Sequence, residues 1–192
     1  YRSAEMSGRF AADVDVEMVP GRPLQWEFSL EPDYLDVLYR GTGISLEFDG
    51  GSLDALNGNL SLESLSGVSQ GGAFVVSGDI VPGRRLRADL RFDYDGRLRS
   101  PDAEAVLPDS AVAVLDAVSY DDGDGTSIRS GRLGLDVDTE TGDTSVDFDG
   151  DLLFHDAALI AGIPLVGIDG RMGLRVRAGA DVATEVDFEG AL

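Results

Sequence analysis

The sequence predicts an all-β fold, a long curled antiparallel meander that forms a U-shaped groove and carries two short helices. Apolar and polar residues alternate through 146–176 and through most other strand-like segments, which places the apolar side chains of each strand on one face. Short turns containing Gly or Pro separate these segments, as in hairpins. The helical stretches are too few and too short to connect parallel strands, so the pattern favours an antiparallel sheet.

The composition limits the classes of partner. The chain has 192 residues, 43% hydrophobic and 27% charged, which fits one folded domain. Its formal net charge is -21, and binding to nucleic acid needs clustered cations, so we expect no nucleic-acid partner. The same charge disfavours flat adhesion to an anionic membrane surface. Without cysteine, the chain has no disulfide and no zinc–cysteine site.

The expected elements follow the alternation along the chain. A short helix is expected at 32–40, where Asp33 can cap a turn presenting Leu35, Leu38 and Tyr39. A second helix is expected at 107–118. We expect a turn at 155–158 and a break at Pro164. The expected strands are 8–18, 24–30, 43–48 (ended by Gly50-Gly51), 56–62, 73–81, 85–94, 133–137, 146–154, 159–163, 168–176 and 182–188.

The apolar face of such a sheet must be covered. About three large apolar side chains per strand, at roughly 1.5–3 kcal/mol each, cannot be left in water. Ten or more strands at ~4.8 Å spacing give a sheet roughly 50 Å long, and open sheets of this size tend to curl. The face is then either the core of a closed sandwich or the inside of a trough that holds a ligand, and the alternation alone favours the closed core.

The chain also repeats itself, which bears on its domain organisation. Phe-Asp-Gly occurs at 48–50 and again at 148–150, and a helix candidate precedes each half. Both ends of the sequence lie within strand patterns. We therefore expect residues 1–192 to form a single β-groove segment of a longer protein, built from two half-repeats at about 32–95 and 107–192.

Candidates for chemistry are few, and each has a structural explanation. His155 is the sole histidine and adjoins an expected turn, so a solvated residue is favoured over a general base or metal ligand. The acidic loop 121–125 resembles a calcium loop, but counting from Asp122 puts Leu133 at position 12, where an EF-hand needs Glu. Acidic sets at alternate positions, such as Asp147 and Asp149, fall on a solvated face. We expect no enzyme activity, no cofactor and no metal site.

Four stretches carry a resemblance to a known family. They are the run from Leu107-Pro108-Asp109 to Leu115, then 131–135 (GRLGL), 146–150 (VDFDG) and 161–170 (AGIPLVGIDG). In this order they resemble the AsmA-like family of bacterial envelope proteins, which are repeating β-groove, bridge-like lipid-transfer proteins. The resemblance covers 107–192, and 43–94 more loosely.

The resemblance implies a U-shaped sheet whose apolar inner surface shields lipid acyl chains during transfer between the envelope membranes, in support of the outer membrane. It implies a periplasmic location, an anchor in the inner membrane, and phospholipid or another acyl-chain lipid as the partner. This sequence has no run of the roughly 18 apolar residues that a membrane helix needs. Membrane contact is therefore expected through parts of the protein outside the segment.

On this interpretation the groove is lined by apolar side chains from most of the expected strands. The expected lining residues are Val14, Val16, Trp26, Phe28, Ile44, Leu46, Phe48, Leu60, Leu62, Leu90, Phe92, Leu133, Leu135, Val146, Phe148, Leu152, Phe154, Met172, Leu174, Val176, Val186 and Phe188. The alternative is a closed β-sandwich that serves as a structural or interaction module of a secreted or surface protein. A calcium-dependent or hydrolytic enzyme is a remote third hypothesis.

Overall fold

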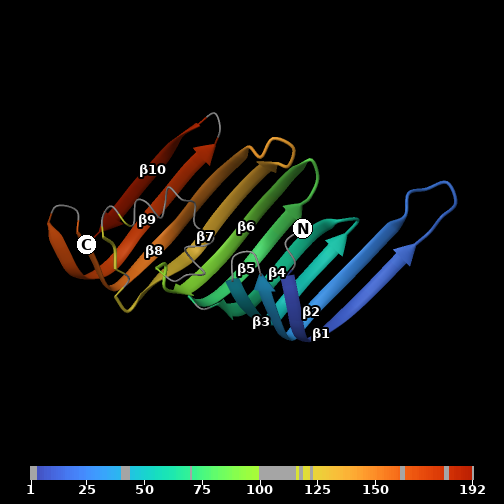
Figure 1. Cartoon of the computed structure of the whole chain (residues 1–192), viewed down its shortest axis with the longest axis horizontal. Helices are drawn as coiled ribbons and strands as arrows, with labels where there is room; N and C mark the ends of the chain where they lie inside the picture. The colour runs from blue at the N-terminus through green and yellow to red at the C-terminus, as the bar shows by residue number, and fades with distance from the viewer. Residues whose placement is uncertain are drawn as a thin grey trace.

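The computed structural model describes residues 4–39, 44–69, 71–99, 116, 119–121, 123–160, 163–179 and 182–191. The strands of this part form a single ten-stranded sheet in which every strand pairs antiparallel with the next in sequence (Figure 1). The prediction of an all-β antiparallel meander is therefore confirmed. The strands are β1 (Ala4–Glu17), β2 (Gln25–Tyr39), β3 (Ile44–Leu56), β4 (Asn59–Ser69), β5 (Gly72–Val81), β6 (Arg85–Gly96), β7 (Gly125–Asp138), β8 (Thr144–Ile160), β9 (Pro164–Gly179) and β10 (Val182–Ala191).

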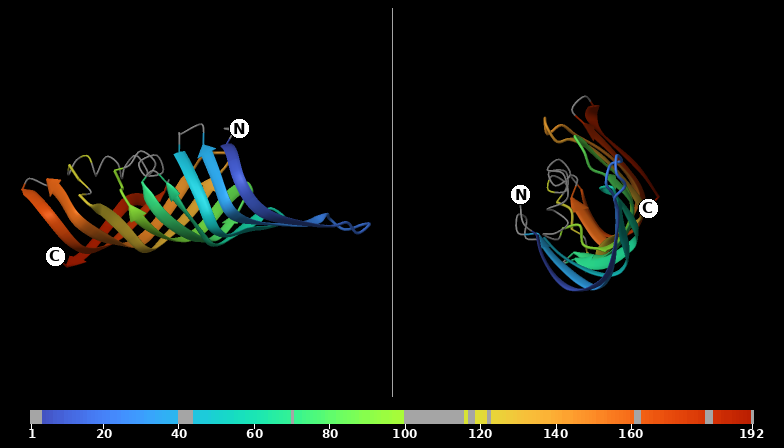
Figure 2. Two further views of the ribbon diagram at one scale, coloured as in Figure 1. Left: turned by 90° about the horizontal axis from the view of Figure 1, so that it is seen from below. Right: turned by 90° about the vertical axis from the view of Figure 1, so that its right-hand side faces the viewer.

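The sheet is curved, and it is U-shaped when viewed along its long axis (Figure 2). Its solvent-accessible surface is 12244 Å², whereas a compact monomer of the same mass would expose roughly 8,800 Å². The excess is what one open layer produces, because the described strands all belong to one sheet and form no second layer over one another. Nine spacings between ten strands, at ~4.8 Å each, make the sheet about 43 Å long.

Bulges within the strands bend the sheet. Ser64, Ser130 and Asp156 each have a positive φ, near 50°, at a point where the pairing register shifts. Each bulge amide is held by a side chain of the adjacent strand: Ser64 N donates to Ser77 Oγ at 3.0 Å, Ser130 N to Asp93 Oδ1 at 2.7 Å, and Asp156 N to Asp169 Oδ1 at 3.1 Å. Because a bulge kinks its strand and increases the local twist, these bulges account for much of the curl.

The hairpin between β3 and β4 is built by Asn57-Gly58, whose φ values of 50° and 93° suit a two-residue turn of the primed type. Asn57 Oδ1 also accepts a hydrogen bond from Trp26 N at 3.1 Å. The expected strand at 56–62 is therefore wrong, because a turn interrupts it. The expected end of a strand at Gly50-Gly51 is also wrong: this pair is a bulge within β3.

The predicted helix at 32–40 is wrong, because these residues up to Tyr39 belong to β2. Pro32 lies at a register shift between β1 and β2, where a strand tolerates a residue without an N–H. Strand pairing on both sides overrides the local helical spacing of Leu35 and Leu38. The predicted helix at 107–118 lies outside the described residues except for 116. In the described part of the chain, no helix is long and apolar enough to cross a membrane.

The region after Phe154 also differs from expectation. The predicted turn at 155–158 is a bulge inside β8, and β8 continues to Ile160. The separate strand expected at 159–163 is therefore wrong. Pro164 does not break the chain: it is the first residue of β9, a position where its missing N–H is tolerated.

Candidate functional site

The apolar side chains of the sheet form rows that cross it from edge to edge. Because facing residues in paired strands share a face, the register shows which side chains are neighbours. One row crosses all ten strands: Ala12, Leu30, Leu53, Leu62, Gly78, Leu90, Leu133, Phe148, Val176 and Val186. A parallel row crosses nine: Val14, Phe28, Ala55, Leu60, Ile80, Ala88, Leu135, Val146 and Ala178. We call this side the apolar face.

Aromatic rings on the apolar face lie over glycines, which allows the inside of a curved sheet to be packed. A Cβ added to Gly67 would come 3.0 Å from the Phe74 ring, and one added to Gly131 would come 3.0 Å from the Phe92 ring. Phe92 in turn lies 6.0 Å from Phe148, between ring centroids. A larger residue at either glycine would crowd the ring, and at Gly67 its Cβ would also lie 2.2 Å from the carbonyl oxygen of Glu47.

The described residues just before β7, 119–121 and 123–124, identify the apolar face as the inner side of the curve. The Tyr120 ring packs edge-on against Phe154, with centroids 6.2 Å apart, and its hydroxyl contacts Thr126 Oγ1. Thr126 is fully buried. This yellow segment lies within the U of the sheet (Figure 2). The apolar face therefore lines a trough, and the charged face is the outer surface.

Every residue expected to line the groove occupies a position on the apolar face. Ile44, Val186 and Phe188 are placed there by the backbone register alone. For the other expected lining residues, such as Trp26, Phe48 and Leu152, the structure describes the side chain as well as the backbone. The expected lining left out further residues of this face, both within expected strands, as at Leu86 and Ala88, and beside bulges that the alternation does not reveal, as at Leu65 and Ile128. The further residues are Leu30, Leu35, Val37, Leu53, Ala55, Leu65, Phe74, Val76, Ile80, Leu86, Ala88, Tyr94, Ile128 and Val137.

The apolar face is open over much of its area. The described residues provide no second sheet to cover it. Leu65, Ile128 and Leu152 are buried near the bulges, but most of their neighbours are only half-buried. Toward β1 the face becomes strongly exposed, and Val14 is 66% accessible to solvent. An apolar surface of this extent on a folded protein is typical of a ligand or protein contact.

The outer face is charged and is organised as facing acidic and basic strands. Asp147 and Asp149 of β8 stand opposite arginines of β9, and Asp151 reaches an arginine diagonally. The pairs are Arg177–Asp147 at 3.7 Å, Arg175–Asp149 at 2.6 Å and Arg171–Asp151 at 2.5 Å. These six side chains are between 34% and 67% exposed, and pairs that remain in contact with water add little stability. The pairs match the register of β8 with β9, and they keep the outer surface well hydrated.

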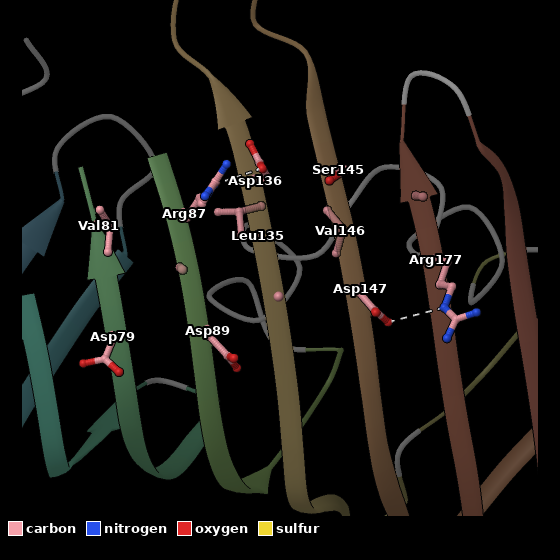
Figure 3. Close-up of a pocket in the computed structure, with 13 residues that line it drawn as sticks. Asp79, Val81, Arg87, Asp89, Leu135, Asp136, Ser145, Val146, Asp147 and Arg177 are labelled. Atoms are coloured by element: carbon pink, nitrogen blue, oxygen red, sulfur yellow. Dashed lines mark ion pairs between the residues drawn. The ribbon is translucent and has the colours of Figure 1, made fainter. Parts of the chain in front are cut away.

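A shallow depression of about 500 Å³ lies on this outer face beside Asp89 and Asp147 (Figure 3). Its lining includes Gly134, which has no side chain to fill it. Asp89, Asp147 and Arg177 border it. The carboxylates and guanidinium groups here remain in contact with water. The depression is thus a consequence of Gly134 in a twisted sheet, and it offers no desolvated group to bind or activate a substrate.

Hydrogen bonds from arginine lower the pKa values of two carboxylates on the outer face. The hydrogen bonds from Arg132 to Asp89, at 3.0 and 2.7 Å, lower the pKa of Asp89, and the one from Arg171 lowers that of Asp151. A carboxylate whose pKa is lowered by folding stabilises the fold above its unfolded pKa of about 3.9. That stabilisation is lost as the pH falls through the lower, folded pKa.

We expect Arg132→Gln to raise the pKa of Asp89 toward its ordinary value, because the variant removes the charged donor. Carboxyl ¹³C chemical shifts followed between pH 2 and 6 measure this. Below about pH 4, the free energy of unfolding should also change less with pH in the variant than in the unmodified chain. Arg84→Gln is the control: Arg84 pairs with Glu140 at 3.1 Å, so this change should not move the pKa of Asp89. An unchanged Asp89 pKa in Arg132→Gln would contradict the assignment.

The other candidates for chemistry, His155 and the acidic loop 121–125, adjoin each other through backbone hydrogen bonds. His155 is exposed in β8, and its carbonyl accepts a hydrogen bond from Asp124 N at 3.0 Å. In the acidic loop, Asp121 Oδ1 accepts from Gly123 N at 3.1 Å, as in an ordinary Asx turn. Asp122 lies outside the described residues. Within the described ranges, no group of three or more His, Cys, Asp or Glu side chains could hold a metal ion.

The site is therefore an open apolar trough, lined by rows of aliphatic and aromatic side chains and backed by a charged outer face. Its geometry suits the burial of hydrocarbon rather than the activation of a bond. Comparison of the chain with protein-family models, with curated protein sequences and with solved structures gave no match.

Proposed function

We propose that this chain is a non-enzymatic section of an AsmA-like periplasmic groove, and that it shields lipid acyl chains from water as they pass between the envelope membranes. The observation that carries the proposal is the row of apolar residues that crosses all ten strands on the inner side of an open sheet. An interrupted row would leave polar gaps, whereas this one offers hydrocarbon contact from one edge to the other.

The dimensions agree with such a role. The hydrocarbon core of a bilayer is ~30 Å thick, so one acyl chain extends over about 15 Å. The trough is about 43 Å long at ~4.8 Å per strand and exceeds that length. Each CH₂ group is worth ~0.8 kcal/mol when it leaves water. Because the bilayer and the trough both remove it from water, a chain can move between them at nearly constant hydrophobic free energy.

The lipid partner is a phospholipid or another acyl-chain lipid. Membrane contact, on this proposal, belongs to parts of the protein outside this segment, with the anchor in the inner membrane. The closed-sandwich alternative requires a second sheet over the apolar face, and the described strands all belong to one sheet. We therefore favour the open trough.

The test is whether lipid occupies the trough. Native mass spectrometry and organic extraction of the purified chain should detect co-purifying lipid, and the delipidated chain should bind NBD-labelled phosphatidylcholine. Absence of lipid in both measurements would overturn the proposal.

A labelled cysteine can locate the lipid, because the chain has no cysteine of its own. Leu62 on the apolar face and Ser61 on the outer face are adjacent in β4. We expect bimane attached at Leu62→Cys to shift its emission to the blue when phosphatidylcholine vesicles are added, since an acyl chain replaces water around it. The same label at Ser61→Cys should respond little. Equal responses at both sites would point to non-specific adsorption.

A further inference from the structure

The outer edge of β1 is unlike the interior of the sheet in three respects. The first is the backbone. β1 is the last strand on its side of the described sheet, so one edge of this 14-residue strand has no neighbour to receive its N–H and C=O groups. Proteins usually shield a long strand edge of this kind, because it readily adds another strand.

The second is apolar exposure. Phe10, Val14 and Val16 are 52%, 66% and 54% exposed, while Ala55, in the same row as Val14, is 3% exposed. The rows that continue from strand to strand through the sheet end at β1 with one flank open. A further strand carrying apolar residues would extend them.

The third is charge. On the outer face, the acids of β1 have no basic residue opposite them in β2. Asp13, Asp15 and Glu17 stand opposite Ser29, Glu27 and Gln25. By contrast, Asp147 and Asp149 of β8 stand opposite Arg177 and Arg175 of β9. A strand of the opposite charge can therefore lie beside the acidic stretch of β1 only along its open edge.

We propose that this edge binds an extended polypeptide segment in which Arg or Lys alternates with apolar residues. The added strand pairs its backbone with β1, places its basic residues beside the three acids, and continues the apolar face on the other side. A second copy of the chain fits poorly. Its β1 would bring the same acids against these, and the outer-face positions of β10 are Glu185, Asp187 and Glu189. Like charges on facing positions are destabilising.

The sheet itself supplies a probe. The peptide RMGLRVRAG, residues 171–179 of β9, has the required alternation and lies beside an acidic strand in the fold. We expect the fluorescein-labelled peptide to bind the full chain saturably in fluorescence anisotropy, and a version with its three arginines changed to Glu not to bind. N-methylation at one alternate set of peptide residues should abolish binding and at the other set should not, since only one edge of the peptide pairs with β1.

Protein variants locate the site. The triple variant D13N/D15N/E17Q should weaken binding at least tenfold. The charge-matched control E47Q/E63Q/D79N removes three exposed acids of the same face from β3, β4 and β5, and should change binding less than twofold. Equal weakening in the two variants, or tolerance of N-methylation at both sets, would overturn the proposal. The outcome does not depend on whether the trough holds lipid, because the edge lies beside the trough.

Discussion

Replacing Val76 with Asp is expected to reduce binding of NBD-labelled phosphatidylcholine at least tenfold. Val76 is half-buried on the apolar face of β5, opposite Leu65 in β4 and Phe92 in β6. An ionised carboxylate retains its water there and excludes hydrocarbon from its surroundings. Loss of contact with two or three CH₂ groups, at ~0.8 kcal/mol each, corresponds to more than a tenfold loss of affinity.

The matched control is the adjacent residue. Val75 faces outward, is 40% exposed, and stands opposite Ser66 and Asp93. Val75→Asp introduces the same side chain into the same strand and should leave lipid affinity within about twofold. Circular dichroism and thermal unfolding should show both variants folded, with Val76→Ala as a milder probe of the same position. If Val76→Asp binds lipid as well as Val75→Asp does, the apolar face does not hold the lipid.

The assignment of faces could be predicted from the sequence because strand alternation is a local property. Phe148 and Asp149, for example, occupy opposite faces whatever pairs with them, and the register of β8 with its neighbours agrees. The same property identifies Leu90 and Phe92 in β6. Hence the expected lining residues share one face although the bulges shown by the structure were not foreseen.

The bulges could not be predicted in the same way, because they depend on neighbouring strands. The residues around Ser130 do not by themselves fix a bulge, because its amide is held by Asp93 from β6, 37 residues away. The predicted helix at 32–40 failed for a related reason, since Leu35 has helical spacing to Leu38 but is buried between Gly8 and Phe48 in paired strands. The openness of the trough is likewise a property of the whole sheet, which alternation cannot distinguish from a closed core.

The bulge in β3 leads to the second prediction, that Gly51→Ala lowers the free energy of unfolding by about 2–4 kcal/mol. Gly51 has a φ of 84°, and a Cβ added to it would lie 2.3 Å from the carbonyl oxygen of Ser64 and 2.5 Å from Leu65 Cα. These are backbone atoms of β4, so they cannot rotate away as a side chain could. Relief requires β3 and β4 to separate where Leu65 is buried. Urea denaturation followed by circular dichroism measures the change.

Gly58→Ala separates strain from packing. Gly58 has a similar φ of 93°, but a Cβ added there would have no atom within 4 Å. This variant therefore bears only the conformational cost of a left-handed residue, about 1–2 kcal/mol. The excess cost of Gly51→Ala measures how tightly the bulge presses β3 against β4. Equal costs would mean that the strands yield freely at this point, and a sheet that yields there could not hold its curve by bulges. A clear excess ties the shape of the trough to one backbone contact between two strands.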